Sequence, residues 1–95
     1  MGTSLFYPMK NKNKAVIPRQ KDVSDLYLKK LGKRIKQLRI KKGYTSYEYF
    51  AYEHNISRAQ FGRYEQGKDL RYSTLIKIIH AFDLNIKEFF SEGFE

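Results

Sequence analysis

The residues with the most distinctive chemistry follow Ser57, in the run Arg58-Ala59-Gln60-Phe61-Gly62-Arg63. An arginine guanidinium presents N–H donors in a planar fork, which can pair bidentately with O6 and N7 of guanine. A glutamine side chain can pair with adenine, and an alanine methyl can contact the methyl group of thymine. If these side chains share an exposed surface, the chemistry available to this run is the recognition of base edges.

The sequence offers little for catalysis or metal binding. It contains no cysteine, and its two histidines, His54 and His80, have no further histidine at a spacing that suits a metal ion. It also lacks a glycine-rich phosphate loop, a nucleophile elbow and a paired-carboxylate motif. We therefore expect a protein that is not an enzyme and that holds no metal and no cofactor.

The charge balance favours an anionic partner. The 95 residues include nineteen Lys and Arg against ten Asp and Glu, which gives a net charge of +9. Thirteen of the basic residues but two of the acidic ones fall within residues 1–45. A basic N-terminal half is typical of proteins that bind nucleic acid, although it can also serve to keep a tail in solution. A chain of this length is expected to form one domain.

Targeting signals are not evident in the sequence. Residues 1–8 lack the basic and apolar regions of a secretory signal, and no run approaches the roughly 18 apolar residues that span a bilayer. The absence of cysteine fits a reducing compartment. The expected location is therefore cytoplasmic, with no membrane partner.

Helices must position the run after Ser57, and the apolar pattern predicts five of them. Residues 1–21 contain both prolines and show no apolar period, which predicts a flexible basic arm. A helix from about residue 22 to 42 follows, capped by Asp22 or Ser24 and ended by Gly43. Its inward face carries Leu28, Leu31, Ile35 and Leu38.

Four shorter helices are expected after the first. Ser46 opens the second, and the third runs from Ser57 to Gly67. Ser73 opens the fourth and Asn85 the fifth. The side chains expected to face inward are Tyr47, Phe50, Ala51, His54, Phe61, Tyr64, Leu75, Ile78, Ile79, Phe82, Ile86, Phe89 and Phe90. Those expected to face outward on the third helix are Arg58, Ala59, Gln60, Gly62 and Arg63. The fold class is therefore all-α, with a domain over residues 22–92 and a tail over 93–95.

Residues 46–66 have the spacing of two helices that cross at a tight turn. Such helices cross at about 90–120° where a small residue lets the backbones approach and where the turn accepts a left-handed residue. Ala51 meets the first need and Asn55 the second, since Asn adopts positive φ at little cost. Phe61 supplies the apolar side chain that packs the second helix on the first. The spacing predicts a helix-turn-helix.

Over about residues 31–90 the chain resembles the Cro and lambda-repressor-like helix-turn-helix family, also called the XRE family. The matching segments are Leu31-Gly32-Lys33-Arg34-Ile35, Ile56-Ser57-Arg58, Arg63-Tyr64-Glu65-Gln66-Gly67-Lys68 and Leu75-Ile76-Lys77-Ile78. The family usually has Gly in place of Asn55 and Gln in place of Tyr47. The resemblance implies a compact five-helix DNA-binding domain whose helix 58–66 enters the major groove. It also implies a regulator of transcription, most often a repressor.

The resemblance and the chemistry of the side chains together suggest roles on DNA. The residues expected to read bases are Arg58, Ala59, Gln60 and Arg63. The residues expected to contact phosphates are Lys33, Lys36, Lys41, Lys42, Ser46, Tyr47, Ser57 and Lys68. The resemblance further implies a buried or half-buried ion pair between Arg39 and Glu65. For Gly62 two interpretations stay open, a close approach to DNA or room for a packing neighbour.

The expected partner is double-stranded DNA, bound by a homodimer because one module of this size reads few base pairs. The basic residues of 1–21 either follow the DNA or only keep the arm in solution. The alternative function is an antitoxin, or another protein-binding module that uses the same domain to neutralise a partner protein and to autoregulate. The dimer surface is expected at Leu84, Ile86, Phe89, Phe90 and Phe94, unless these side chains only cap the core.

Overall fold

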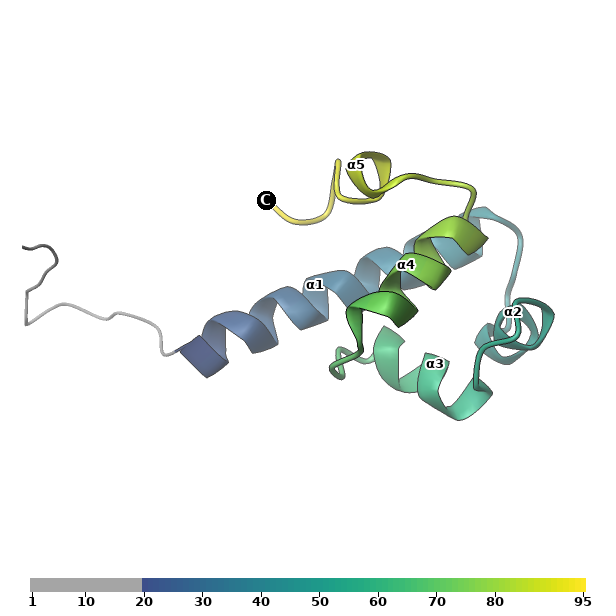
Figure 1. Ribbon diagram of the computed structural model, residues 1–95, viewed down its shortest axis with the longest axis horizontal. Coiled ribbons are helices and arrows are strands. Elements are labelled where there is room, and N and C mark those ends of the chain that lie inside the picture. Colours follow the sequence, from purple (N-terminus) through teal and green to yellow (C-terminus); the bar gives the residue numbers. More distant parts are fainter. Residues whose placement is uncertain (1–19) are drawn as a thin grey trace, which may run out of the picture.

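The computed structural model describes residues 20–95, and within that range the chain forms five α-helices and no strand (Figure 1). The predicted all-α class is confirmed. The arm expected over residues 1–21 lies outside the described residues, except that Gln20 and Lys21 belong to the first helix. The helices are α1 (Gln20–Lys41), α2 (Tyr47–Glu53), α3 (Arg58–Glu65), α4 (Tyr72–Ala81) and α5 (Ile86–Phe89).

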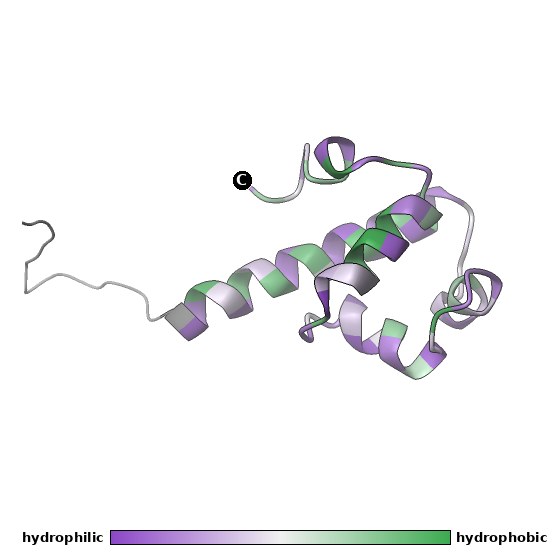
Figure 2. Ribbon diagram, in the orientation of Figure 1, coloured by the Kyte–Doolittle hydropathy of each residue, from purple (hydrophilic) through white to green (hydrophobic). Residues whose placement is uncertain are grey.

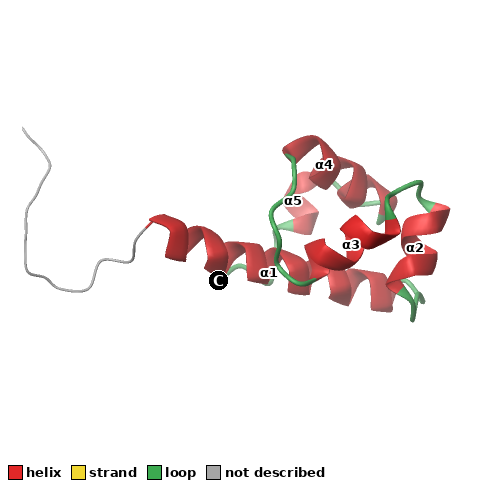
Figure 3. Cartoon of the chain, turned by 90° about the horizontal axis from the view of Figure 1, so that it is seen from below, coloured by secondary structure: helices red, strands yellow, loops and turns green. Residues whose placement is uncertain are grey.

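The long helix α1 begins earlier than predicted. Because it starts at Gln20, Asp22 lies inside its first turn and neither Asp22 nor Ser24 caps it. An acidic side chain in the first turn is favourable there, since the N-terminal end of a helix carries partial positive charge. The first turns of α1 project beyond the other helices in two perpendicular views (Figures 1 and 3). The rest of α1 is the surface on which the other helices pack.

The first four helices all end with a residue of positive φ, at Gly43, Asn55, Gly67 and Asp83. After α1, the N–H of Gly43 donates to the carbonyl of Ile40 at 2.9 Å and that of Tyr44 donates to Arg39 at 3.1 Å. This pair of bonds is the Schellman motif, which satisfies carbonyls left open at a helix end. The same pattern at Asn55 confirms that the turn between α2 and α3 is left-handed there.

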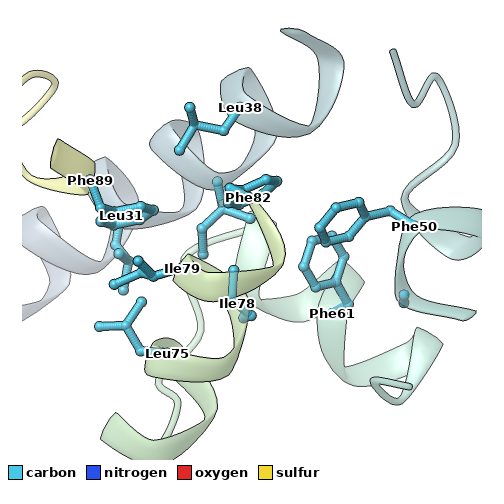
Figure 4. Packing of buried hydrophobic residues seen from close by; sticks show 11 residues of the cluster. Leu31, Leu38, Phe50, Phe61, Leu75, Ile78, Ile79, Phe82 and Phe89 are labelled. Carbon is cyan, nitrogen blue, oxygen red and sulfur yellow. The ribbon is translucent and has the colours of Figure 1, made fainter. Parts of the chain in front are cut away.

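All five helices contribute to the core (Figure 4). Phe50 of α2 and Phe61 of α3 lie with ring centroids 5.2 Å apart, and Phe82 stacks on Phe50 at 4.9 Å. Burial of one such side chain contributes about 1.5–3 kcal/mol, so these aromatic contacts hold α2 and α3 together. The buried apolar residues are Leu31, Ile35, Leu38, Phe50, Ala51, Phe61, Leu75, Ile78, Ile79, Phe82 and Phe89.

The start of α4 differs from the prediction and that of α5 agrees with it. Arg71 precedes α4 and no side chain caps that helix, so Ser73 lies within the helix and does not open it. Asn85 caps α5 in a capping box with Glu88, each side chain bonding to the backbone N–H of the other.

The burial of the C-terminal aromatic residues is mixed. Phe89 is fully buried, as predicted. Ile86 and Phe90 are 44% and 40% exposed, so their predicted burial is wrong. Ile86 is the first residue of α5 and Phe90 the residue after its last, and the ring of Phe90 packs edge-on against that of Phe89 with centroids 4.9 Å apart. Since Phe89 is enclosed in the core, it cannot belong to the dimer surface expected from the sequence.

Arg34 holds α5 against α1. Its guanidinium donates to the carbonyls of Phe89 at 2.8 Å and Glu88 at 3.1 Å, and lies 3.3 Å from the carboxylate of Glu92. These bonds satisfy a buried charge and the open carbonyls at the end of α5. Lys30 also donates to the backbone oxygen of Glu95, so the residues expected to form a tail, 93–95, lie against α1.

The helices α1 and α3 come closest at Gly32. A Cβ atom on Gly32 would lie 2.6 Å from the carbonyl oxygen of Tyr64 and 2.7 Å from that of Glu65. Both oxygens belong to the backbone of α3, so they cannot move aside unless the whole helix shifts. The missing side chain at Gly32 therefore sets the distance between α1 and α3.

We expect Gly32→Ala to lower the free energy of unfolding by about 2–3 kcal/mol, because the added methyl must push α3 away from α1. Urea unfolding followed by circular dichroism measures this loss. Lys33→Ala, at the exposed neighbouring position, is the control and should stay within about 0.5 kcal/mol of the parent. An unchanged unfolding midpoint for Gly32→Ala would contradict the close approach.

Candidate nucleic-acid interface

The turn between α2 and α3 is held by local hydrogen bonds and by one bond from α4. Ser46 and Ser57 cap α2 and α3, as predicted, each accepting through Oγ from the backbone N–H three residues later, at 3.2 and 3.3 Å. The hydroxyl of Ser46 in turn donates to Oε1 of Glu48 at 3.4 Å, whereas that of Ser57 keeps its own proton as a donor. Lys77 of α4 donates to the backbone oxygen of Asn55 at 2.8 Å. The start of α3 is therefore fixed to both neighbouring helices.

The helix α3 turns one face to the core and the other to solvent. Phe61 and Gly62 are buried. At about 100° per residue, Ala59, Gln60 and Arg63 lie within about 100° of one another, on the side opposite Phe61 and Gly62. Arg58 lies in line with the buried side, three residues before Phe61, and is exposed at the first residue of the helix. Three of the four predicted base-reading side chains therefore share one exposed face of α3, and Arg58 stands at the start of the helix, where it lines a hollow together with Ala59. The exposed residues of α3 are Arg58, Ala59, Gln60 and Arg63.

Gly62 lies on the buried side of α3, so its expected outward position is wrong. A Cβ atom on Gly62 would lie 2.7 Å from Cε1 of Tyr47. The half-buried ring of Tyr47 fills the space that a side chain at residue 62 would need. Of the two interpretations of Gly62, the structure supports room for a packing neighbour. Tyr47, expected to contact phosphate, uses its ring in this packing.

Arg39 and Glu65 form the expected ion pair across the contact between α1 and α3. Nε of Arg39 donates to Oε2 of Glu65 at 2.6 Å, and Nη2 donates to Oε1 at 3.1 Å. The two side chains are 5% and 7% exposed. A third donor, Nη1, bonds to the carbonyl of Tyr44 at 2.7 Å. The pair is bidentate and shielded from water, which makes it both strong and sensitive to the loss of either partner.

The lysines expected to contact phosphates do not all lie beside α3. Lys33 and Lys36 are exposed on the flank of α1 next to Gly32, where α3 packs. Lys68 is exposed just after α3. Lys41, by contrast, lines a hollow with residues of α5 and of the segment that follows it.

Lys42 also points away from α3. Its Nζ lies 2.9 Å from Oδ2 of Asp83, at the end of α4. The hydrogen bond and the charge of Lys42 lower the pKa of Asp83. The structure therefore brings Lys33, Lys36 and Lys68 near α3 and does not bring Lys41 and Lys42 there.

Two exposed tyrosines of α2 were not assigned from the sequence. Tyr49 and Tyr52 are 55% and 71% exposed. Each lines a shallow hollow on the surface that it shares with Arg58. The signal that would have found them is their spacing of three residues around the inward pair Phe50 and Ala51, which places both on the solvent side of α2.

The end of α2 carries an acid and a histidine that are both engaged locally. The hydroxyl of Tyr44 donates to Glu53, and hydrogen bonds from Tyr44 and Tyr49 lower the pKa of Glu53. Nδ1 of His54 lies 2.9 Å from the carbonyl of Phe50, and the two rings are 4.2 Å apart. His54 thus packs at the helix end, half-buried rather than turned fully inward.

Other classes of site gain no support from the described part of the chain. Among residues 20–95, no three His, Asp or Glu side chains are grouped so that they would hold a metal ion. No helix in that range combines the length and the apolar character needed to cross a membrane. The chain has no match among protein-family models, curated proteins or solved structures. Its function is therefore inferred from its own residues and their geometry.

We expect Glu65→Ala to lower the free energy of unfolding by about 3–5 kcal/mol, because it leaves the charge of Arg39 buried without a partner. The double variant Arg39→Met with Glu65→Leu should recover most of this loss, since it removes both charges and keeps apolar volume. Urea unfolding measures both. An unchanged stability together with an unchanged DNA affinity for Glu65→Ala would contradict the role given to the pair.

Proposed function

We propose that this protein is a sequence-specific regulator of transcription, most often acting as a repressor, that binds double-stranded DNA with α3 in the major groove. The observation that carries the proposal is the division of α3 into two faces. Phe61 and Gly62 are buried against the other helices, while Ala59, Gln60 and Arg63 are exposed on the outer face and Arg58 is exposed at the first residue of the helix. The resemblance to the lambda-repressor-like family, over the segments given above, supports the same assignment.

Each exposed side chain of α3 has a matching base edge. The major groove is about 12 Å wide and admits one helix, whose N-terminal residues approach the bases. Arg58 then pairs with O6 and N7 of guanine, Gln60 with N6 and N7 of adenine, and Ala59 touches a thymine methyl. Arg63, one to two turns later, reaches a base or a phosphate. Sequence is read by these contacts.

Phosphate contacts orient the protein on the duplex without reading its sequence. Lys33, Lys36 and Lys68 lie beside α3 and supply positive charge. The hydroxyl of Ser57 accepts from the backbone and still has a proton to donate to a phosphate oxygen, whereas the proton of the Ser46 hydroxyl points to Glu48 and would have to turn from it to reach phosphate. The basic residues of 1–21, outside the described range, would add to this attraction if they follow the backbone or the minor groove.

Two copies of the protein are needed for a site of useful length. One α3 helix reaches base edges with three or four side chains and so reads few base pairs, whereas a two-fold dimer reads two half-sites about 34–36 Å apart. The regulated sequence would then be a palindrome. The protein therefore acts on DNA as a homodimer in this proposal.

Selection of bound duplexes from a random pool tests the proposal. We expect an enriched palindrome for the parent protein, and a loss of about 1–3 kcal/mol of discrimination at one position of each half-site for Arg58→Ala. Lys87→Ala in α5 is the control, because it removes one exposed charge on the side of the domain opposite α3 (Figure 1). Absence of any enriched sequence would overturn the proposal and favour the antitoxin alternative.

Lys36→Ala should weaken binding to all duplexes by a similar factor, since Lys36 contacts phosphate in this account. The slope of log affinity against log salt concentration should fall by about 1. Affinity measured by fluorescence anisotropy between low and moderate salt gives this slope. A slope equal to that of the Lys87→Ala control would show that Lys36 makes no phosphate contact.

A further inference from the structure

The projecting part of α1 carries apolar side chains that no other described helix covers. Val23, Leu26 and Tyr27 are 40%, 51% and 48% exposed. They lie in the first turns of α1, which extend past the rest of the domain, and Figure 2 shows hydrophobic residues along this part of the helix. A helical segment of this length is marginal in water without packing. These side chains are therefore placed to contact another surface.

The apolar surface continues from α1 onto the C-terminal segment. Tyr27, Leu28 and Leu31 line a hollow together with Phe90 and Phe94. The rings of Phe90 and Phe94 lie 4.7 Å apart at its edge. The apolar surface runs from Leu26 around α1 through Val23 and Tyr27 to Phe90 and Phe94, and Ser24 and Asp69 also line the hollow.

The charges along this part of α1 are complementary to a second copy that runs in the opposite direction. Asp22 precedes the centre of the segment at Leu26, and Lys29 follows it. The second acid, Asp25, pairs with Lys21 of the same helix at 3.3 Å, and Lys30 lies over the ring of Tyr27. Asp22 and Lys29 are seven residues apart, so both lie on the same flank of the helix. Flanking charges of this kind decide the orientation of paired helices. An antiparallel copy sets Asp22 against Lys29, whereas a parallel copy sets Asp22 against Asp22 and Lys29 against Lys29.

We propose that two copies of this chain associate through antiparallel packing of their α1 helices, with the two-fold axis near Leu26. The contact covers Val23, Leu26 and Tyr27 and extends over Phe90 and Phe94. Asp22 of each copy faces Lys29 of the other. Because the interface is two-fold, the one patch is used twice, which is the common arrangement in soluble homodimers.

This surface differs from the one expected from the sequence. It keeps Phe90 and Phe94 and leaves out Leu84, Ile86 and Phe89, the last of which is buried in the core. The proposed function needs a dimer, and this surface would be its interface. Only the role of the dimer on DNA rests on the proposed function. Association is measured without DNA, so the two proposals can fail separately.

Sedimentation of the full chain over a range of concentrations, without DNA, tests the contact. We expect a concentration-dependent dimer for the parent and a dissociation constant raised about tenfold or more by Leu26→Asp, which places a charge at the centre of the interface. Ile40→Asp is the matched control, because Ile40 is 53% exposed on the same helix but lies outside the proposed patch. It should leave the dissociation constant unchanged. Circular dichroism checks that each variant keeps its helices.

Charge reversal tests the antiparallel orientation. Asp22→Lys and Lys29→Asp should each raise the dissociation constant about threefold to tenfold, since each sets like charges across the axis twice. The double variant with both changes should return to within about twofold of the parent, because every pair is again opposite in sign. A parent that stays monomeric at all concentrations, a dimer insensitive to Leu26→Asp, or a double variant weaker than either single one would overturn the proposal.

Discussion

The side chains of Arg39 and Glu65 join α1 to α3 through two hydrogen bonds between opposite charges, and both are almost fully withdrawn from water. Gly32, about two turns earlier on α1, brings the same two helices into backbone contact. A buried pair of this kind tolerates little displacement, since a separation of the charges leaves each one without solvent or partner. The ion pair and the contact at Gly32 together fix the direction of α3 relative to α1. With this direction, the outer face of α3 stays exposed to solvent.

The remaining contacts of α3 also hold this helix in its position. Phe61 packs on the aromatic core, Tyr47 of α2 covers Gly62, and Lys77 of α4 binds the turn at Asn55. The inner face of α3 is thus held by three other helices, while its outer face is left for a ligand. Side chains that read base edges need this rigidity, because an error of about 1 Å in their position costs much of their specificity.

Much of this fold follows from local signals in the sequence. The inward faces are marked by apolar residues at helical spacing, and the left-handed turns by Gly43, Asn55 and Gly67. Signals of this kind act within a few residues, so they can be recognised without knowledge of the fold. The exposure of Ala59, Gln60 and Arg63 was predictable for the same reason, since Phe61 indicates which side of that helix must be buried.

The errors concern residues whose role depends on a distant neighbour. Gly62 was expected to face outward, but the ring of Tyr47, from α2, packs against it. The residues next to Gly62 in the sequence give no sign of this contact. Lys42 was expected near phosphate, but its partner Asp83 lies 41 residues away.

The most direct measurement of the central claim is the change in backbone amide NMR shifts when duplex DNA is added. The account predicts that the largest changes fall on residues 58–63, and largest changes on α5 or none at all would contradict it.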